Sequence, residues 1–339
     1  MKKTLIALAA MASISAFAQA TITPYARVDL GVGATTVTGK TDAGLTAVNS
    51  GYNTSNFGVK GESDIGGGSK AFAKLELGLS PADAGGFGNA SWGRTGIVGV
   101  SGGFGAIQLG MDWSPYDNAF NEAMDYNHFS AIGAAWGGGV HADNGTDSSV
   151  GSAVGHVQYT TPTVGGFNAL IMYAPSKNTT TGNSTSYTSL GVNYGAGPLA
   201  ISAAMETVPT SVQGALGATA GDGNNTTSYV LTVGYNLGGA TVYGAYENAK
   251  ANGAGLSATD TGTALGVKLP LGSAELSVGY ASEETSGDAK SKRSAYAAQV
   301  LYPLGKQAKA YFGYRSSKDD ATATDITTTK YVGGLTMSF

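Results

Sequence analysis

The residues of this chain with the clearest capacity for chemistry are carboxylates that lie close together in the sequence. They are Asp112, Asp117, Glu122, Asp125, Asp143 and Asp147. No Lys or Arg occurs anywhere in residues 112–156. Paired carboxylates can act as acid and base in glycoside hydrolysis, but one of the pair then needs an apolar environment that raises its pKa. The surrounding sequence is polar, so the pattern favours a solvated, negatively charged lining over a hydrolytic site.

The histidines do not form a recognisable metal site. His128, His141 and His156 are the only three, and all lie in or beside the same stretch. Their spacing does not match zinc-binding motifs, so the sequence predicts neither a metal centre nor another cofactor. Asp143 and Asn144 with Asp147, or Asp222 with Asn224, could bind a divalent cation through oxygen ligands, and this alternative stays open. No spacing of Ser, His and Asp singles out a catalytic triad, and we predict that the protein is not an enzyme.

The end of the chain indicates which kind of element carries these residues. In residues 329–339, one side of a period-two pattern carries Tyr331, Gly333, Leu335, Met337 and Phe339. The residues between them are mostly polar, which predicts a strand with one apolar face. A strand in this position needs partners on both sides, since unpaired backbone groups would leave an open edge. The simplest solution is a closed barrel in which the last strand pairs with the first.

The beginning of the chain predicts export. Lys2 and Lys3 precede an apolar run over residues 5–17, and residues 18–20 (AQA) form a small-residue cleavage site. We assign residues 1–20 to a signal peptide and residues 21–339 to one domain. Without Lys2 and Lys3, 17 of the 19 basic residues remain against 23 acidic residues, a formal net charge of −6. This acidic balance argues against nucleic-acid binding.

Glycine-rich turns recur along the chain with a long and short rhythm. Short turns are predicted near residues 66–68, 101–103, 163–165, 195–197, 237–239, 271–272 and 304–305, and longer polar stretches lie between them. Each short turn joins two strands into a hairpin, which gives about 16 strands in all. Short turns at one end and long loops at the other are typical of transmembrane barrels.

Alternation within the strands supports a water-filled interior. In residues 307–315, one side carries Ala308, Ala310, Phe312 and Tyr314. The other side carries Lys309, Tyr311, Gly313 and Arg315. A small and charged set of side chains cannot fill a core, so the apolar side must face outward. We therefore predict an all-β protein, a transmembrane antiparallel β-barrel with a polar lumen.

The same parity assigns charged residues of the first strands to the lumen. They are Arg27, Lys60, Glu62, Lys74 and Glu76. We expect the two lysines of this set and the two glutamates to neutralise one another across neighbouring strands.

Several segments together resemble a known family. They are residues 22–32 (ITPYARVDLGV), 56–68 (NFGVKGESDIGGG), 69–78 (SKAFAKLELG), 94–105 (RTGIVGVSGGFG), 107–110 (IQLG), 159–162 (YTTP) and 165–167 (GGF). This combination is similar to the trimeric general porins of Gram-negative bacteria, especially those of the β-proteobacterial and neisserial type. The terminal Phe339 agrees, and the resemblance implies that Tyr331, Leu335, Met337 and Phe339 form a C-terminal assembly signal.

The resemblance implies a homotrimer of sixteen-stranded barrels in the outer membrane, each with its own pore for passive diffusion of small hydrophilic solutes and ions. A substrate-specific channel is the nearest alternative, and a barrel enzyme or an adhesin is a more distant one. It further implies contacts with outer-membrane lipid and lipopolysaccharide, and with the barrel-assembly machinery during insertion. The long loop after the fifth strand, residues 112–152, is expected to fold inward and narrow the pore.

The resemblance also sharpens the list of residues at the constriction. Relatives often carry Arg where this chain has Asn56, Met111 and Ser152, and of that basic wall only Arg94 remains. The candidates for lumen and constriction are therefore Arg27, Lys60, Glu62, Lys74, Glu76, Arg94, Asp112, Asp117, Glu122 and Asp125. Because the loop is rich in carboxylates, we predict a weak to moderate preference for cations.

Overall fold

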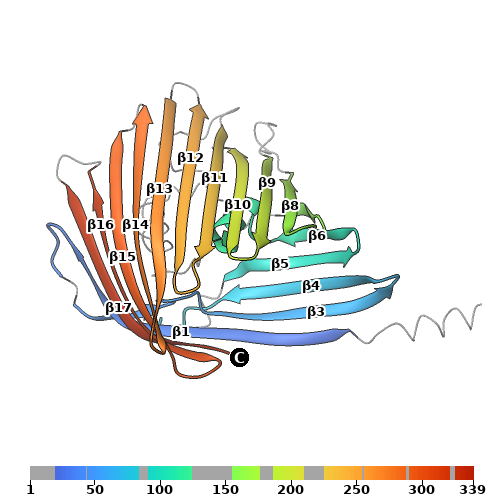
Figure 1. The fold of residues 1–339 in the computed structure, drawn as a ribbon, viewed down its shortest axis with the longest axis horizontal. Coiled ribbons are helices and arrows are strands. Elements are labelled where there is room, and N and C mark those ends of the chain that lie inside the picture. Colours follow the sequence, from blue (N-terminus) through green and yellow to red (C-terminus); the bar gives the residue numbers. More distant parts are fainter. Residues whose placement is uncertain are drawn as a thin grey trace, which may run out of the picture.

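The structure is a computed structural model that describes residues 20–42, 44–83, 91–123, 155–175, 186–209, 225–253, 256–287, 290–320 and 325–339. Within these ranges no helix is long and apolar enough to cross a membrane. The strands form one antiparallel sheet (Figure 1). They are β1 (Thr21–Val37), β2 (Thr46–Asn49), β3 (Asn56–Gly66), β4 (Ser69–Gly78), β5 (Ser91–Gly102), β6 (Gly105–Met111), β7 (His156–Thr160), β8 (Phe167–Ala174), β9 (Tyr187–Ala196), β10 (Leu199–Pro209), β11 (Asn225–Asn236), β12 (Thr241–Gly253), β13 (Leu256–Leu271), β14 (Ala274–Gly287), β15 (Ser291–Pro303), β16 (Ala308–Asp319) and β17 (Ile326–Ser338), and a helix, α2 (Pro115–Ala123), follows β6.

The sheet closes on itself between its first and last strands. β1 pairs with β17 from Arg27↔Ser338 to Val37↔Thr328. Beyond this ladder the backbone N–H of Ala26 donates to the carbonyl of Phe339 at 2.8 Å, and the N–H of Phe339 donates to the carbonyl of Ala26 at 3.0 Å. The predicted closed barrel, with the last strand paired to the first, is confirmed. Closure removes the open sheet edge that the terminal strand would otherwise present.

The predicted strand number is also confirmed. The sheet has 17 strands in the described residues, but β2 has only four residues and pairs with the far half of β1 rather than crossing the barrel. The other sixteen are the strands of the barrel wall. Short connections such as residues 67–68 and 272–273 join strands at one end of the barrel. We call this the short-turn end.

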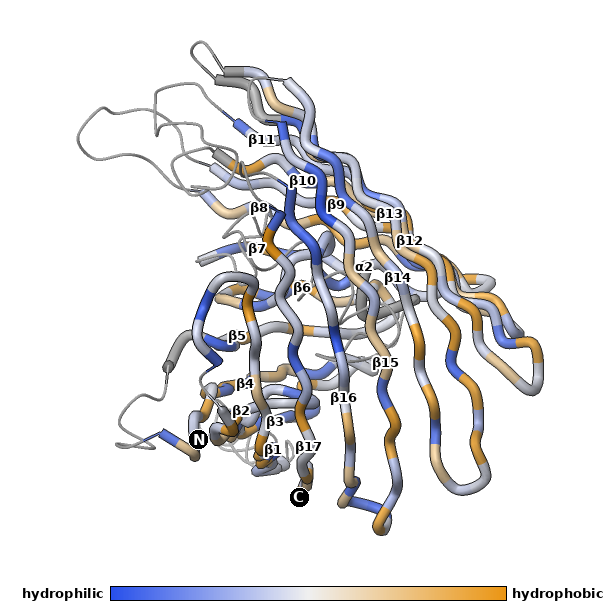
Figure 2. Tube along the Cα trace, turned by 90° about the vertical axis from the view of Figure 1, so that its left-hand side faces the viewer, coloured by the Kyte–Doolittle hydropathy of each residue, from blue (hydrophilic) through white to orange (hydrophobic). Residues whose placement is uncertain are grey.

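Apolar and polar side chains alternate along the wall strands, as the tube in Figure 2 shows by its changing colour. On β11, Tyr229 and Leu231 are 51% and 44% exposed, whereas the neighbouring Ser228 and Thr232 are fully buried. On β16, Phe312 is exposed and Tyr311 and Arg315 are buried. The outer face is therefore apolar and the inner face polar, which confirms the predicted reversal of a soluble barrel.

The last strand follows the same rule. Tyr331, Leu335, Met337 and Phe339 all lie on the exposed outer face, while Val332 points inward and is buried. The predicted apolar face of the terminal strand is thus confirmed.

Candidate functional site

A cluster of charged side chains lies on the inner face of β1, β4 and β5. We call it the Glu76 cluster; it consists of Tyr25, Lys74, Glu76 and Arg94. The hydroxyl of Tyr25 donates to Oε2 of Glu76 at 2.7 Å, and the ammonium of Lys74 lies 3.5 Å from the same oxygen. The guanidinium Nε of Arg94 donates to the other carboxylate oxygen. The Glu76 side chain is only 7% exposed. Its buried negative charge is compensated by two cations and by the hydrogen bond from the Tyr25 hydroxyl.

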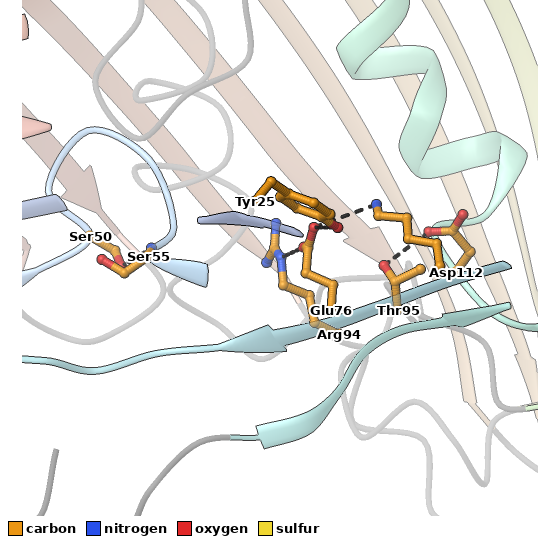
Figure 3. Close-up of polar contacts among 8 residues, drawn as sticks. Tyr25, Ser50, Ser55, Glu76, Arg94, Thr95 and Asp112 are labelled. Atoms are coloured by element: carbon orange, nitrogen blue, oxygen red, sulfur yellow. Dashed lines mark hydrogen bonds and ion pairs between the residues drawn. The ribbon is translucent and has the colours of Figure 1, made fainter. Parts of the chain in front are cut away.

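The register of the strands explains how Tyr25 reaches Glu76. Tyr25 lies opposite Gly58 on β3, Gly58 lies opposite Glu76 on β4, and Glu76 lies opposite Thr95 on β5. A Cβ atom on Gly58 would sit 2.3 Å from Cζ of Tyr25. The ring therefore lies across β3 in space that only glycine leaves open. Figure 3 shows Tyr25, Glu76 and Arg94 converging on one another.

The Glu76 cluster continues into the segment that follows β6. Thr95 donates through Oγ1 to Oδ1 of Asp112 at 3.3 Å, and Figure 3 shows this pair next to Glu76 and Arg94. The guanidinium of Arg94 also lies over the ring of Trp113, 5.5 Å from its centroid. The start of the long loop is thus fixed to the same wall as the charged cluster.

Helix α2 begins immediately after this point, with a well-formed N-terminal cap. The backbone N–H of Asp117 donates to Oγ of Ser114 at 3.0 Å, and Ser114 Oγ donates to Oδ2 of Asp117 at 3.0 Å. Ser at the N-cap, Pro115 at the first helical position and an acidic residue two further on are typical helix-start residues. Asp117 is therefore a buried part of the cap, 8% exposed.

The helix packs against the inner face of β9, β10 and β11. The backbone N–H of Tyr116 donates to Oγ of Ser189 at 3.1 Å, and Thr232 Oγ1 donates to the carbonyl of Ala119 at 2.6 Å. Ser189 and Thr232 alternate with the exposed Leu190 and Leu231, so the side that contacts α2 is the lumen side. This part of the predicted constriction loop, up to the end of α2, lies inside the barrel (Figure 2).

Buried carboxylates on this second wall accept hydrogen bonds from tyrosines. The hydroxyl of Tyr116, which is fully buried, donates to Oε1 of Glu247 on β12. The hydroxyl of Tyr187 donates to Oε2 of Glu206 on β10 at 2.6 Å. Glu206 is fully buried and Glu247 is 3% exposed. We call α2 together with β9–β12 the α2 wall.

A second segment folds inward between β2 and β3. Residues 50–55 leave the ladder of β1 and are held by Asp29, whose carboxylate accepts the backbone N–H of Asn53 at 2.9 Å and that of Tyr52 at 3.2 Å. Tyr311 Oη also donates to Asp29, at 2.7 Å. Asp29 is fully buried. This inward segment was not predicted from the sequence, although Asp29 shares the lumen parity of Arg27.

The remaining charged candidates are more exposed than Glu76. Glu62 pairs with Lys70 at 3.2 Å, and both side chains are more than half exposed. Lys60 lies opposite Lys74 in the register of β3 and β4 rather than opposite a carboxylate. Arg27 donates to Oγ of Ser338 at 3.4 Å. Charge neutralisation between β3 and β4 therefore involves Lys70, which was not among the predicted lumen residues.

Several predicted residues lie wholly or partly outside the described residues. They are Asp125, His128, His141, Asp143, Asn144, Asp147, Ser152, Asp222 and Asn224, together with residues 1–19 of the predicted signal peptide. Glu122 has a described backbone in α2 but no described side chain. The preference for cations rests mainly on these carboxylates and stays a prediction. His156 lies on β7 and is buried. Of the two described positions expected to replace arginines, Asn56 is buried and Met111 ends β6.

Taken together, the inner face carries two structured regions on different strands. The Glu76 cluster presents lysine and arginine side chains that are about a quarter to a third exposed, and the α2 wall presents a docked helix. Among the described residues, no group of three or more acidic or histidine side chains is arranged to hold a metal ion. The arrangement can narrow a polar passage and set its charge.

Comparison with known proteins identifies relatives along the whole chain. A family profile described as Gram-negative porin matches residues 4–322. Outer membrane porin protein 32 of Delftia acidovorans is 31% identical over 99% of this chain and 95% of its own length. A major outer membrane protein P.IB of Neisseria gonorrhoeae is 34% identical over 57% of this chain and 53% of its own length.

Solved structures share the fold. A structure titled anion-selective porin from Comamonas acidovorans superposes with a TM-score of 0.77 and 23% identity, covering 95% of this chain and all of that one. OmpT of Vibrio cholerae, in a form described as a trimer, superposes with a TM-score of 0.70 and 15% identity over 95% of this chain and all of that one.

Proposed function

This chain belongs to the Gram-negative porin family, and we propose that it forms a water-filled channel for passive diffusion of small hydrophilic solutes and ions across the outer membrane. The observation that carries this proposal is the orientation of its wall. Exposed apolar residues such as Ile171, Leu231 and Leu265 cover the outside, and buried polar residues such as Ser202 and Thr232 line the inside. An apolar band suits lipid, and a polar lining suits water.

The narrow part of the channel is proposed to lie between the Glu76 cluster and the α2 wall. Arg27, Lys60, Lys74, Arg94 and Asp112 would provide charge on one side. On the other side, Glu122 near the end of α2 and Asp125 in the segment that follows α2 would provide charge. Asp117 would act by fixing the start of α2, and Glu62 by balancing Lys70 near the short-turn end.

A liposome-swelling assay tests the channel directly. Liposomes that contain the purified protein should swell in solutions of small sugars, at rates that fall as the sugar becomes larger. If the loops served an adhesive role and the lumen were plugged, no sugar would enter. A narrow preference for one solute over others of equal size would favour a substrate-specific channel. An enzyme on this barrel would require hydrolytic turnover in an activity screen, and we expect none.

We propose that the protein assembles as a homotrimer. The support is the family itself and the trimeric form of a structure with the same fold. On unheated gel electrophoresis the protein should migrate as a slow band that converts to the monomer on boiling. A monomer found by light scattering in mild detergent would contradict the trimer.

The two ends of the chain are proposed to serve export and insertion. Residues 1–20 would be removed as a signal peptide, which leaves residues 21–339 as the barrel domain, in contact with outer-membrane lipid and lipopolysaccharide. Tyr331, Leu335, Met337 and Phe339 would be recognised by the barrel-assembly machinery. Deleting Phe339 should lower the amount of protein in the outer membrane, whereas deleting Lys40 in the first loop should not. Normal insertion without Phe339 would exclude its role as a signal.

A further inference from the structure

A cleft lies at the short-turn end of the barrel, where the first and last strands meet. We call it the seam cleft. Its lining includes two residues of the Glu76 cluster, Tyr25 and Glu76, and six further polar residues: Arg27, Asn56, Lys306, Gln307, Lys309 and Ser338. We propose that the seam cleft binds a small, doubly charged oxyanion. This proposal rests on the channel function above, because the ligand would reach the cleft from the lumen or from the periplasm.

Strand register brings these residues together from distant parts of the chain. Arg27 on β1 lies opposite Ser338 on β17 and, on its other side, opposite Asn56 on β3. The backbone N–H of Ser338 donates to the carbonyl of Gln307 at 3.0 Å. The lining residues therefore form a continuous row from the turn before β16, across β17 and β1, to β3. Closure of the barrel between β1 and β17 completes this row.

The cations of this row lack acidic partners. Within the described residues, no carboxylate lies within ion-pair distance of Arg27, Lys306 or Lys309. Glu76 also borders the cleft, but Lys74 and Arg94 already hold its charge. Even when the terminal carboxyl group at Phe339 is counted against them, the cations are in excess. A concentration of positive charge in a recess attracts anions and raises their local concentration.

Lys309 is held in place by the segment that folds inward from β2. Its ammonium lies over the ring of Tyr52, 5.6 Å from the centroid. Tyr52 in turn packs on Tyr311 with ring centroids 5.8 Å apart, and Tyr311 donates to the buried Asp29. A cation over an aromatic face loses part of its freedom before any ligand binds, so the structure positions this lysine.

The donors in the cleft fit the chemistry of a dianion. Arginine presents a planar fork that pairs with two oxygens of one group, and lysine adds a compact charge. The side-chain amides of Asn56 and Gln307 supply neutral N–H donors. Three cations set against the terminal carboxyl group of Phe339 leave an excess of two positive charges. A singly charged oxyanion would neutralise one of them, whereas an ion with two charges and several oxygens would neutralise both.

Outer-membrane barrels have short turns on the periplasmic side, which places the seam cleft at the periplasmic mouth. The test is a planar-bilayer recording in potassium chloride, with sulfate added to one side at a time. Sulfate should reduce the share of the current that chloride carries, obtained from the reversal potential in a salt gradient, at lower concentrations from the periplasmic side than from the other. Methanesulfonate, which has a similar oxyanion head and one charge, should be much weaker. Because the chain has no cysteine, a Ser273→Cys variant in the exposed short turn before β14 and a thiol reagent too large to pass through the pore identify that side.

Variants separate the cleft from general charge effects. Lys306→Gln and Lys309→Gln should each raise the half-effective sulfate concentration about tenfold, the weight of one charge-assisted hydrogen bond. Lys70→Gln removes the same charge from a lysine that pairs with Glu62 near the same end, and should leave the sulfate effect unchanged. Tyr52→Leu should weaken sulfate binding, whereas Tyr52→Phe, which keeps the ring, should not.

Equal sulfate sensitivity from both sides, or no change in Lys306→Gln and Lys309→Gln, would overturn the proposal. Equal potency of sulfate and methanesulfonate would do so as well. An open channel in potassium chloride that does not respond to sulfate would refute the cleft and leave the channel function standing. Absence of any current would instead contradict the channel itself.

Discussion

The Glu76 cluster and the α2 wall line the same lumen but satisfy their polar residues in different ways. At the Glu76 cluster, a carboxylate is neutralised by Lys74 and Arg94, whose side chains are 34% and 24% exposed. At the α2 wall, Glu206 and Glu247 are almost completely buried and accept hydrogen bonds from Tyr187 and Tyr116. One region remains open to water, and the other is covered by a helix.

The difference suggests a division of roles. Ion pairs that water can reach are screened and contribute little rigidity, but they leave charge available to passing ions. Buried hydrogen bonds under a packed helix are costly to break, so they fix a shape. We therefore expect changes at the α2 wall to alter channel size and changes at the Glu76 cluster to alter ion selectivity.

The largest effect is expected from Tyr116→Ala at the α2 wall. It removes a fully buried aromatic side chain and its hydrogen bond to Glu247, which should weaken the docking of α2 by about 3–5 kcal/mol. The helix should detach, and single-channel conductance should rise with little change in ion selectivity. Tyr116→Phe keeps the packing and should change conductance much less. If Tyr116→Ala left conductance unchanged, the proposed role of α2 in setting channel size would be wrong.

The second-largest effect is expected from Glu76→Gln in the Glu76 cluster. Loss of this charge leaves Lys74 and Arg94 without their shared carboxylate, at a cost to the free energy of unfolding of about 2 kcal/mol. The reversal potential in a salt gradient should shift toward anions, while conductance changes little. Glu62→Gln removes the same charge from a pair that is more than half exposed, and should cost less than about 1 kcal/mol. Equal effects of the two substitutions would argue against a special role for the Glu76 cluster.

A smaller effect is expected from Gly58→Ala, which tests how the Glu76 cluster is built. The new methyl group would collide with the ring of Tyr25, and the overpacking should cost about 1.5 kcal/mol. The displaced Tyr25 should lose its hydrogen bond to Glu76. Gly61→Ala is the control on the same strand, because a Cβ atom at this position would lie 3.9 Å from its nearest neighbour, the carbonyl oxygen of Thr21. Urea titration of both variants in lipid vesicles measures the difference, and equal stability would contradict this account.

The smallest effect is expected from Ser114→Ala, which removes the cap of α2 without touching its packing. Loss of an N-cap side chain should cost about 1 kcal/mol of helix stability. We expect more frequent brief increases in current as the helix frays, and Ser114→Thr should restore the steady current. A steady current in Ser114→Ala would show that packing alone holds the helix.

Period-two patterns predicted the wall well, because burial on one face imposes the same alternation on every strand. The outward Phe312, the inward Tyr311 and the pairing of the last strand with the first all follow from that rule. The contacts between side chains on distant strands do not follow from this alternation. Tyr311 lies 282 positions from Asp29, its hydrogen-bond partner, and only barrel closure brings them together. Residues 50–55 carry no periodic signal, so their inward fold could not be predicted.

The pairing of charges was predicted less well, because it depends on register as well as parity. Lys60 and Glu62 share a face, but the register of β3 and β4 places Lys60 opposite Lys74 and Glu62 opposite Phe72. The helix cap, by contrast, was not predicted but could have been recognised in the sequence. Ser114, Pro115 and Asp117 have the spacing of a helix start, and this signal would have placed Asp117 in a cap before the structure did.

The most direct test of the whole account is a single-channel recording of the unmodified protein in a planar bilayer. A porin with a water-filled lumen should give stable, discrete current steps whose conductance rises in proportion to salt concentration. These steps should appear without any added ligand. Protein that is demonstrably inserted but gives no current above that of the bare bilayer would contradict it.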